Sequence, residues 1–270
     1  MKEGWHSDIS NEDYHRGKYA TYLGSSSLKE FARSPWHFQQ SRKHPKPTTA
    51  AMELGTLTHT AIFEPEKEAY AVWAGGRRSG KVWDAFKSDA DFCGLPTVTA
   101  SEHEAVLNMK AAVMADETAR ATIMVPDKQC EITGIYQEPS SGVWCKIRPD
   151  LKSLKAEIIV DLKTTVDGSP EGFGWEVWNR RYHWSALHYK IGADLLDGIS
   201  YRFYWMVVEK SPGFPVMFYE ADDEWLWHAG LDIDPMYQHL ARCKREDKWP
   251  GYGGGMDVIP LPMPYRATQH

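Results

Sequence analysis

The first half of the chain carries its hydrophobic residues mainly at helical spacing. Residues 24–40 begin with Gly24 and a serine run, in which Ser27 and Glu30 have the spacing of a capping box. This helix is predicted to end near Ser34-Pro35, because the residue before a proline disfavours helical geometry. A second helix is predicted over residues 51–63, before Glu64-Pro65.

Residues 66–100 have a mixed pattern in which 75–81 is expected to form an exposed loop. A long helix is then predicted from Thr99 or Ser101 to about residue 115, and a short one near 117–124.

The hydrophobic period changes to that of strands after about residue 125. Three short runs are predicted to form a β-meander: 130–137, 142–151 and 157–165. They are followed by a predicted helix, two strands and a last amphipathic helix, over 172–195, 200–209, 214–220 and about 222–246. This order predicts one α/β domain with a mixed central sheet flanked by helices.

Composition narrows the class of protein. Hydrophobic residues make up 42% of the 270 residues and charged residues 25%, as in soluble globular proteins. No apolar run approaches the roughly 20 residues of a membrane span, and the N-terminal residues show no apolar secretory signal. The cysteines lack C-x-x-C spacing, which argues against a zinc ribbon or a disulfide framework and predicts a cytoplasmic location.

Two carboxylates and a lysine in the predicted meander suggest metal-dependent hydrolysis. Asp150 lies at the end of one strand and Asp161 within the next, so antiparallel pairing would bring them together. Lys163 shares a strand face with Asp161. Carboxylate oxygens hold Mg²⁺, which activates water and neutralises charge on a phosphate, while the lysine orients the water or stabilises the transition state.

The spacing alone leaves a structural ion-pair cluster equally open. It also contains a second match, since Asp150-Leu151-Lys152 fits the same D-x-K template. The run that ends in Asp161 and Lys163 is the most strand-like in the chain. Lys152, beside Ser153 and Lys155, is therefore expected to be a solvated lysine in a turn.

Asp150 with Asp161-x-Lys163 resembles the catalytic core of the PD-(D/E)xK nuclease superfamily. Further segments resemble one branch, the RecE-type exonucleases (exonuclease VIII) of phages and prophages: ISNEDYH (9–15), SSSLKEFARSPWHF (25–38), LGTLTHTAIFEP (54–65), IRPDLK (147–152), VDLKTT (160–165), YHWSALHY (182–189) and WPGYG (249–253). The resemblance implies a restriction-endonuclease-like domain over residues 1–270. Its helical part would cover about 1–125, and its catalytic meander and helix about 130–195.

The resemblance implies further metal-site residues. His59 would ligate the metal or lie beside it, although a lone histidine is more often a core residue. Gly55, one turn earlier, would leave room for the site. Glu131 would contact a metal directly or through water, with a surface strand residue as the equal alternative. The carbonyl of Leu162 is a further candidate ligand.

Contacts with DNA are expected from two segments. Tyr182, Ser185 and Tyr189 share one helix face, which would look onto the active site or else belong to the core. Ser185 stands where many relatives have glutamine. The basic residues of the exposed loop could hold the DNA backbone or a 5′ phosphate, or be simply solvated: Arg77, Arg78 and Lys81. The net charge of −6 is unusual for a protein that binds phosphates.

The implied activity is a Mg²⁺-dependent exonuclease, with Mn²⁺ as a substitute, that digests linear duplex DNA from 5′ ends and leaves 3′ single strands. The implied partners are DNA ends, further copies of the chain in a ring, and a single-strand annealing protein of the RecT type, in phage recombination. The alternatives are a structure-specific or restriction-like endonuclease of the same superfamily, and a catalytically inactive relative that binds DNA or docks a recombinase.

Overall fold

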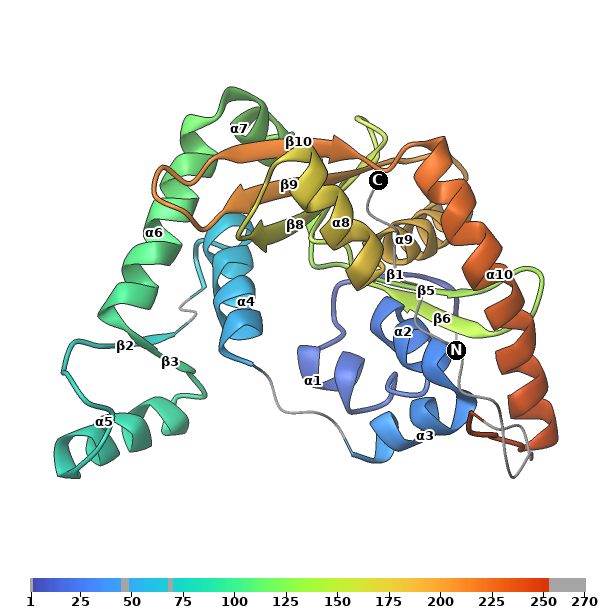
Figure 1. Cartoon of the computed structure of the whole chain (residues 1–270), viewed down its shortest axis with the longest axis horizontal. Coiled ribbons are helices and arrows are strands. Elements are labelled where there is room, and N and C mark those ends of the chain that lie inside the picture. Colours follow the sequence, from blue (N-terminus) through green and yellow to red (C-terminus); the bar gives the residue numbers. More distant parts are fainter. Residues whose placement is uncertain (1, 45–48, 68–69, 253–270) are drawn as a thin grey trace, which may run out of the picture.

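The computed structural model describes residues 2–44, 49–67 and 70–252. Its larger sheet has the strand order β10-β9-β8-β7-β4, with bounds β4 (Gln129–Cys130), β7 (Leu151–Ser153), β8 (Ile158–Thr165), β9 (Arg202–Glu209) and β10 (Val216–Glu220). A smaller sheet has the order β1-β5-β6, with bounds β1 (Gly4–His6), β5 (Thr133–Gln137) and β6 (Trp144–Ile147). Helices lie on both sides of the larger sheet (Figure 1).

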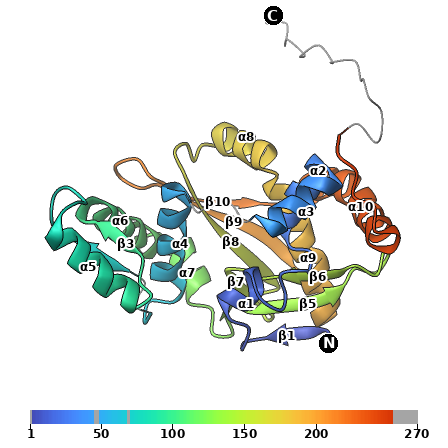
Figure 2. The same cartoon turned by 90° about the horizontal axis from the view of Figure 1, so that it is seen from below.

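The described helices are α1 (Asn11–His15), α2 (Ser25–Arg33), α3 (Pro35–Lys43), α4 (Ala50–Phe63), α5 (Lys81–Phe92), α6 (Ala100–Ala115), α7 (Glu117–Ile123), α8 (Pro170–Arg180), α9 (Tyr182–Asp197) and α10 (Asp223–Glu246). The short parallel strands β2 (Ala71–Trp73) and β3 (Thr97–Thr99) form with α5 a lobe at the opposite side of the molecule from α10 (Figures 1 and 2). The sequence pattern did not predict α5.

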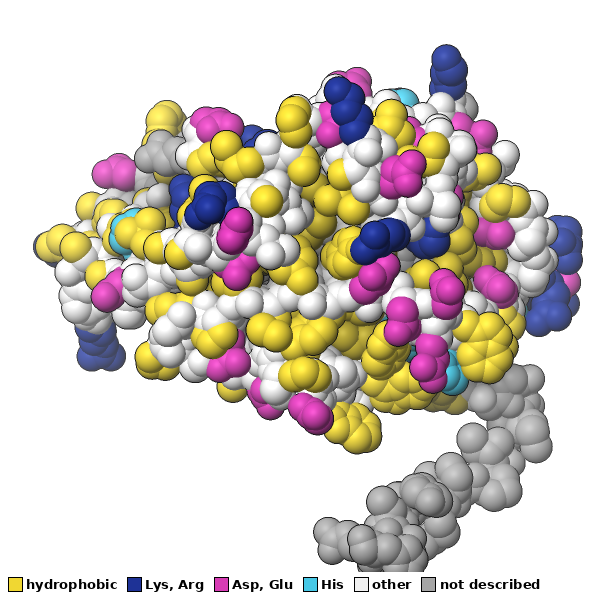
Figure 3. All heavy atoms as spheres, turned by 90° about the horizontal axis from the view of Figure 1, so that it is seen from above, with side chains coloured by type: hydrophobic (Ala, Val, Ile, Leu, Met, Phe, Trp, Pro, Cys, Tyr) yellow, Lys and Arg dark blue, Asp and Glu magenta, His cyan; other side chains and the backbone are white. Residues whose placement is uncertain are grey.

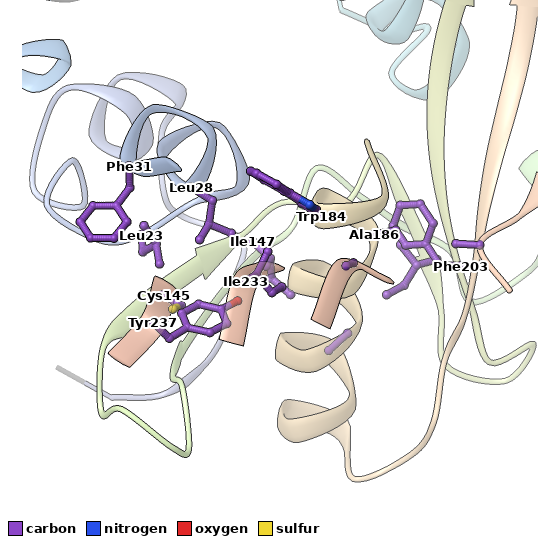
Figure 4. Packing of buried hydrophobic residues seen from close by; sticks show 14 of the residues in the cluster. Leu23, Leu28, Phe31, Cys145, Ile147, Trp184, Ala186, Phe203, Ile233 and Tyr237 are labelled. Atoms are coloured by element: carbon purple, nitrogen blue, oxygen red, sulfur yellow. The ribbon is translucent and has the colours of Figure 1, made fainter. Parts of the chain in front are cut away.

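Strands β8 and β9 form the centre of the larger sheet and pair in parallel, whereas the other pairs of this sheet are antiparallel. The prediction of a mixed sheet is therefore confirmed. Alternate residues of β8 enter different hydrophobic clusters: Ile159 packs with α8, α9 and α10, while Val160 and Leu162 pack with α4, α6 and α7. By this alternation Asp161 and Lys163 share the face of Ile159, toward α9. Figure 4 shows part of that first cluster around Ile147, Trp184 and Phe203.

The predicted three-stranded meander was wrong in one respect. Both runs that precede β8 are divided between the two sheets, as β4 then β5 and as β6 then β7. Glu131, at the first division, has a left-handed backbone (φ 53°), and its N–H donates to the carbonyl of Pro149 at the second (3.2 Å). Pro149 has no N–H for a strand ladder, so the regular pairing stops there.

Two predicted helix details also differ. The Ser27–Glu30 capping box is wrong, because the helix begins at Ser25 with Gly24 in the N-cap position. The predicted helix over 172–195 is two helices, α8 and α9, because Arg181 between them is left-handed (φ 56°). The helix predicted to start at Thr99 or Ser101 is α6, and Thr99 is its N-cap residue, in a capping box with Glu102 that the sequence analysis did not identify.

No helix among the described residues combines the length and the apolar character needed to cross a membrane. Gly253, the last residue of the WPGYG segment, lies outside the described residues.

Lys152 is not the solvated turn residue that the sequence suggested. It lies in β7, only 2% exposed, and its Nζ contacts the Asp197 carboxylate at 2.7 Å. The same ammonium lies 4.2 Å from the centroid of the Trp5 ring. Lys152 therefore joins β1, β7 and the end of α9 in the interior, and its ion-pair partner is Asp197, whereas Asp161 pairs with Lys163.

Lys152→Ala is therefore expected to destabilise the fold by about 3 kcal/mol, the lower end of the cost of breaking a buried ion pair. The lower end applies because Asp197 keeps hydrogen bonds from the Trp5 indole (3.0 Å) and the Tyr201 hydroxyl (2.7 Å). Urea unfolding measures the loss. The exposed neighbour Lys155→Ala serves as the control and should change stability by less than about 0.5 kcal/mol. Equal stability of the two variants would contradict this role.

Candidate active site

The end of β7 places Asp150 beside the middle of β8. Leu151 pairs with Val160, so the next step of the antiparallel register sets Asp150 opposite Asp161. Because β7 begins only at Leu151, the backbone of Leu162 has no strand partner on the β7 side of β8. Its N–H donates instead to the Asp150 Oδ2 at 2.6 Å.

His59 approaches the same point from α4. Its Nδ1 lies 3.2 Å from the Asp150 Oδ2, and its Nε2 lies 2.9 Å from the carbonyl oxygen of Leu162. The histidine predicted to lie near the metal site is thus in contact with two of the other predicted residues. Gly55, one turn earlier, also faces this region, but an added Cβ would meet only Thr164 Oγ1 at 3.9 Å. Lack of space therefore does not require glycine at position 55.

Glu131 completes a group of potential ligands. One ligand atom each from His59, Glu131 and Asp150 lies within 4.8 Å of the others. Glu131 reaches this position from the point where the chain passes between the two sheets, so its unusual backbone conformation is found at the site itself.

The donor set fits a hard divalent cation. Two carboxylates and the Leu162 carbonyl offer the oxygen ligands that Mg²⁺ and Mn²⁺ prefer, and an imidazole is a further ligand for Mn²⁺. Asp150 and Asp161 are each 7% exposed, so two acids occupy a mostly buried place where a cation would offset their charge.

The surroundings shift the pKa values of the two aspartates in opposite directions. Burial raises the pKa of the Asp150 carboxyl, but His59, Lys163 and the Leu162 N–H outweigh burial and lower it below the usual value. At Asp161, burial outweighs the attraction of Lys163, and the pKa is raised. Burial also raises the pKa of Glu131, with help from Asp150, to about 7.

Lys163 is held from two sides. Its ammonium forms an ion pair with Asp161 and lies 5.0 Å from the centroid of the Tyr182 ring. Burial lowers its pKa, but the carboxylates of Asp161 and Asp150 outweigh burial and raise it, so the lysine is charged. The ammonium of Lys29 lies 5.1 Å from the same Tyr182 ring. Burial, together with Lys163, lowers the pKa of Lys29 to about 8.

An open groove of about 1760 Å³ lies over the cluster. His59, Glu131, Leu162 and Lys163 form part of its floor. One wall contains residues of α4, another contains residues of α8, and the segment around α1 lines the remaining side. The groove therefore gives a substrate access to His59, Glu131 and Lys163, next to the buried Asp150 and Asp161.

The structure brings together the predicted catalytic and metal residues, but only part of the predicted DNA contacts. Tyr182 lines the groove. Tyr189 is half-buried, and burial together with nearby charges that include Asp161 raises its pKa well above the usual value. Ser185 is half-buried on the same helix. The basic loop lies on the β2–α5–β3 lobe outside the groove lining, where Arg78 pairs with Glu102 at 2.9 Å; its other members are Arg77 and Lys81.

The chain has a formal net charge of −6. On the face drawn in Figure 3, Lys and Arg side chains are dispersed among Asp and Glu instead of forming a continuous basic patch. This face therefore offers no continuous basic surface to phosphates.

Comparisons with known proteins agree with this geometry. Residues 24–262 match the family described as a PDDEXK-like domain of unknown function, DUF3799. The chain belongs to this family. A search of curated proteins found no significant match. The crystal structure of a candidate exonuclease from Eubacterium rectale is similar, with a TM-score of 0.66 and 15% sequence identity over 96% of this chain and 97% of the other.

The DUF3799 match and the structural likeness place the chain in the PD-(D/E)xK superfamily, with a restriction-endonuclease-like fold. Sequence reasoning overlooked Lys29 at the site. Its segment, SSSLKEF, carried the resemblance, but a single lysine on a predicted helix gives no sign that it will meet Tyr182 and Lys163 from another element.

Metal binding is expected to raise the melting temperature more at pH 8 than at pH 6. In the metal-free protein, the pKa of Glu131 is raised to about 7, and that of His59 is raised because Asp150 outweighs burial. Both groups hold protons below these pKa values, and a cation must displace those protons. Thermal unfolding with and without Mn²⁺ measures the effect.

The Glu131→Gln variant cannot lose a proton at this position, so its Mn²⁺-induced shift should be smaller and should depend less on pH. Equal shifts at pH 6 and pH 8 in the unsubstituted protein would contradict the proposed ligand set.

Proposed function

We propose that this chain is a divalent-metal-dependent exodeoxyribonuclease, active as a single nuclease domain, that degrades linear duplex DNA from 5′ ends and leaves 3′ single strands. The observation that carries the proposal is the cluster of His59, Glu131 and Asp150 with the Asp161–Lys163 pair, of which His59, Glu131 and Lys163 line an open groove. The RecE-type segments support the exonuclease assignment and the 5′ polarity.

One group of residues would bind the metal ion. Asp150, Glu131, His59 and the Leu162 carbonyl would hold Mg²⁺ or Mn²⁺, with Asp161 beside them. When bound, such a cation supplies Lewis acidity toward water and toward phosphate oxygens. His59, then Lys163 and the Leu162 N–H, outweigh burial and keep the pKa of Asp150 below its usual value, and the hydrogen bond from that N–H fixes the orientation of the carboxylate.

Lys163 supplies a positive charge at a fixed position. The Asp161 carboxylate and the Tyr182 ring hold its ammonium, so no reorganisation is needed when charge develops on a phosphate oxygen. The ammonium can donate a hydrogen bond to the attacking water or to that oxygen. Because Lys163 is charged, it acts here as a donor and not as a base.

Two alternatives share the site. A structure-specific or restriction-like endonuclease would use the same residues, and the RecE-type segments at 9–65 disfavour it. An inactive DNA-binding or recombinase-docking relative is disfavoured because Asp150, Asp161 and Lys163 are all present and in contact distance of the cluster.

The assembly and biological role are part of the proposal. The RecE-type resemblance supports a ring of identical chains that threads one DNA end, and hand-over of the 3′ strand to a RecT-type annealing protein during phage recombination. A threaded end would also explain how a protein of net charge −6 retains DNA without a basic surface.

Lys163→Ala is expected to reduce cleavage of linear duplex at least about 100-fold, the loss typical of removing one preorganised donor. Excess EDTA should abolish cleavage, and Ca²⁺ should support binding without turnover. Release of acid-soluble nucleotides measures the rate, and thermal unfolding checks the fold, since Asp161 loses its partner. Lys155→Ala, an exposed lysine, should be fully active. Full activity of Lys163→Ala or activity in EDTA would exclude this mechanism.

Linear duplex should be degraded from its ends, while covalently closed circular duplex should be spared. The sequence offers no base-reading motif such as a helix-turn-helix or zinc finger, so internal cutting has no evident sequence-recognition element. The measurement compares linear and relaxed circular plasmid in Mg²⁺, with 5′- and 3′-labelled linear duplex to define polarity. If circular plasmid is converted to linear fragments at a rate similar to that of end digestion, the alternative function, an endonuclease, would replace this proposal.

A further inference from the structure

Trp175 lies on the wall of the groove with most of its side chain in solvent. The residue is 68% exposed and lines the groove over the carboxylate cluster. Within the part of the chain that the structure describes, no other aromatic ring stacks on it. Its neighbour Trp178 differs, since that indole stacks on the His183 ring at 5.3 Å with parallel planes. Exposure alone does not mark a ligand site, since Trp227 is 60% exposed as well, but Trp175 presents its apolar face on the wall of the groove over the carboxylate cluster.

The orientation of α8 explains why Trp175 faces the groove. Phe173 and Val177 are buried in the core, which fixes one face of this helix. Gly172, Trp175 and Asn179 follow at helical spacing and line the groove, together with Glu176. The core contacts of α8 therefore hold the indole on the substrate side.

The neighbours of Trp175 have the chemistry of nucleotide contacts. The exposed Asn179 carries an amide that both donates and accepts hydrogen bonds, as base edges do. Arg180 also lines the groove and pairs with Glu176 at 2.6 Å, at a position open to solvent. A flat aromatic face, an amide and a cation along one helix suit a base and its phosphate better than they suit an apolar protein surface.

We propose that Trp175 is a stacking platform for an unpaired nucleobase of the DNA strand that enters the active site, with Asn179 and Arg180 beside it. This inference rests on the proposed nuclease function. A base inside a duplex is covered on both faces by its neighbours, so an indole at the groove wall can stack only on a base freed from the stack. Trp175 would therefore favour frayed or single-stranded ends over continuous duplex.

The test measures binding without cleavage. Fluorescence anisotropy in Ca²⁺ compares the unsubstituted protein with Trp175→Ala, Trp175→Phe and the control Trp227→Ala, which changes a 60% exposed tryptophan of α10 outside the groove lining. The probes are a single-stranded oligonucleotide and the same strand with one abasic site placed at successive positions near its 5′ end.

Trp175→Ala is expected to weaken binding of the intact strand about 10-fold, the effect typical of losing one stacked base. Trp175→Phe should recover most of the affinity, and Trp227→Ala should bind normally. At one position, an abasic site should weaken binding to the unsubstituted protein by a similar factor and add no further loss in Trp175→Ala. A merely structural role for the indole would not produce this position-specific loss of additivity.

Additive losses at every abasic position, or normal binding by Trp175→Ala, would overturn the stacking role. Neither result would bear on the proposed nuclease function. The abasic signature in a protein that cleaves no DNA in Mg²⁺ would support the stacking role and refute the nuclease assignment. Failure to bind any DNA would overturn both.

Discussion

The backbone of Leu162 is the point on which the arrangement of the site depends. Strand β7 begins only at Leu151, which pairs with Val160. The residues of β8 after Val160 therefore have no strand neighbour on the β7 side, although β8 remains fully paired with β9 on the other. The free N–H of Leu162 binds Asp150, and its carbonyl contacts His59. The distant helix α4 and the consecutive strands β7 and β8 are thereby joined through the backbone of one residue. An unpaired backbone group near the core would otherwise be costly, so the missing ladder and the polar cluster stabilise each other.

Strand alternation explains why the central residues could be predicted. A period of two places Asp161 and Lys163 on one face regardless of the details of the fold, and antiparallel pairing brings Asp150 opposite. The mixed sheet and most helix positions follow from equally local patterns. The prediction that His59 and Glu131 lie beside these residues required the resemblance, because contacts across 103 residues, such as His59 with Leu162, leave no periodic signal.

The errors have a common physical origin in tertiary context. Lys152 has the sequence surroundings of a solvated turn residue, but Asp197, 45 residues away, supplies a buried partner. The runs 130–137 and 142–151 look like single strands because apolar and polar residues alternate on both sides of the point where each run passes from one sheet to the other. Neither the left-handed Glu131 nor the loss of pairing at Pro149 changes the hydrophobic pattern. The split of the helix at Arg181 is similar, since a lone arginine gives no warning of left-handed geometry.

The break at Arg181 places α8 and α9 in different surroundings. Helix α9 is embedded between the sheets and α10, and it fixes Tyr182 against Lys163. Helix α8 is anchored by Phe173 and Val177, and its Trp178 stacks on His183 of α9. On its groove side, Glu176 accepts a hydrogen bond from the Thr165 hydroxyl of β8 (2.6 Å), whereas Trp175 and Asn179 are exposed to the groove. Under the proposed stacking role, Trp175 and Asn179 are the positions at which natural variants, or a protein engineer, would retune strand preference while the carboxylate cluster stays constant.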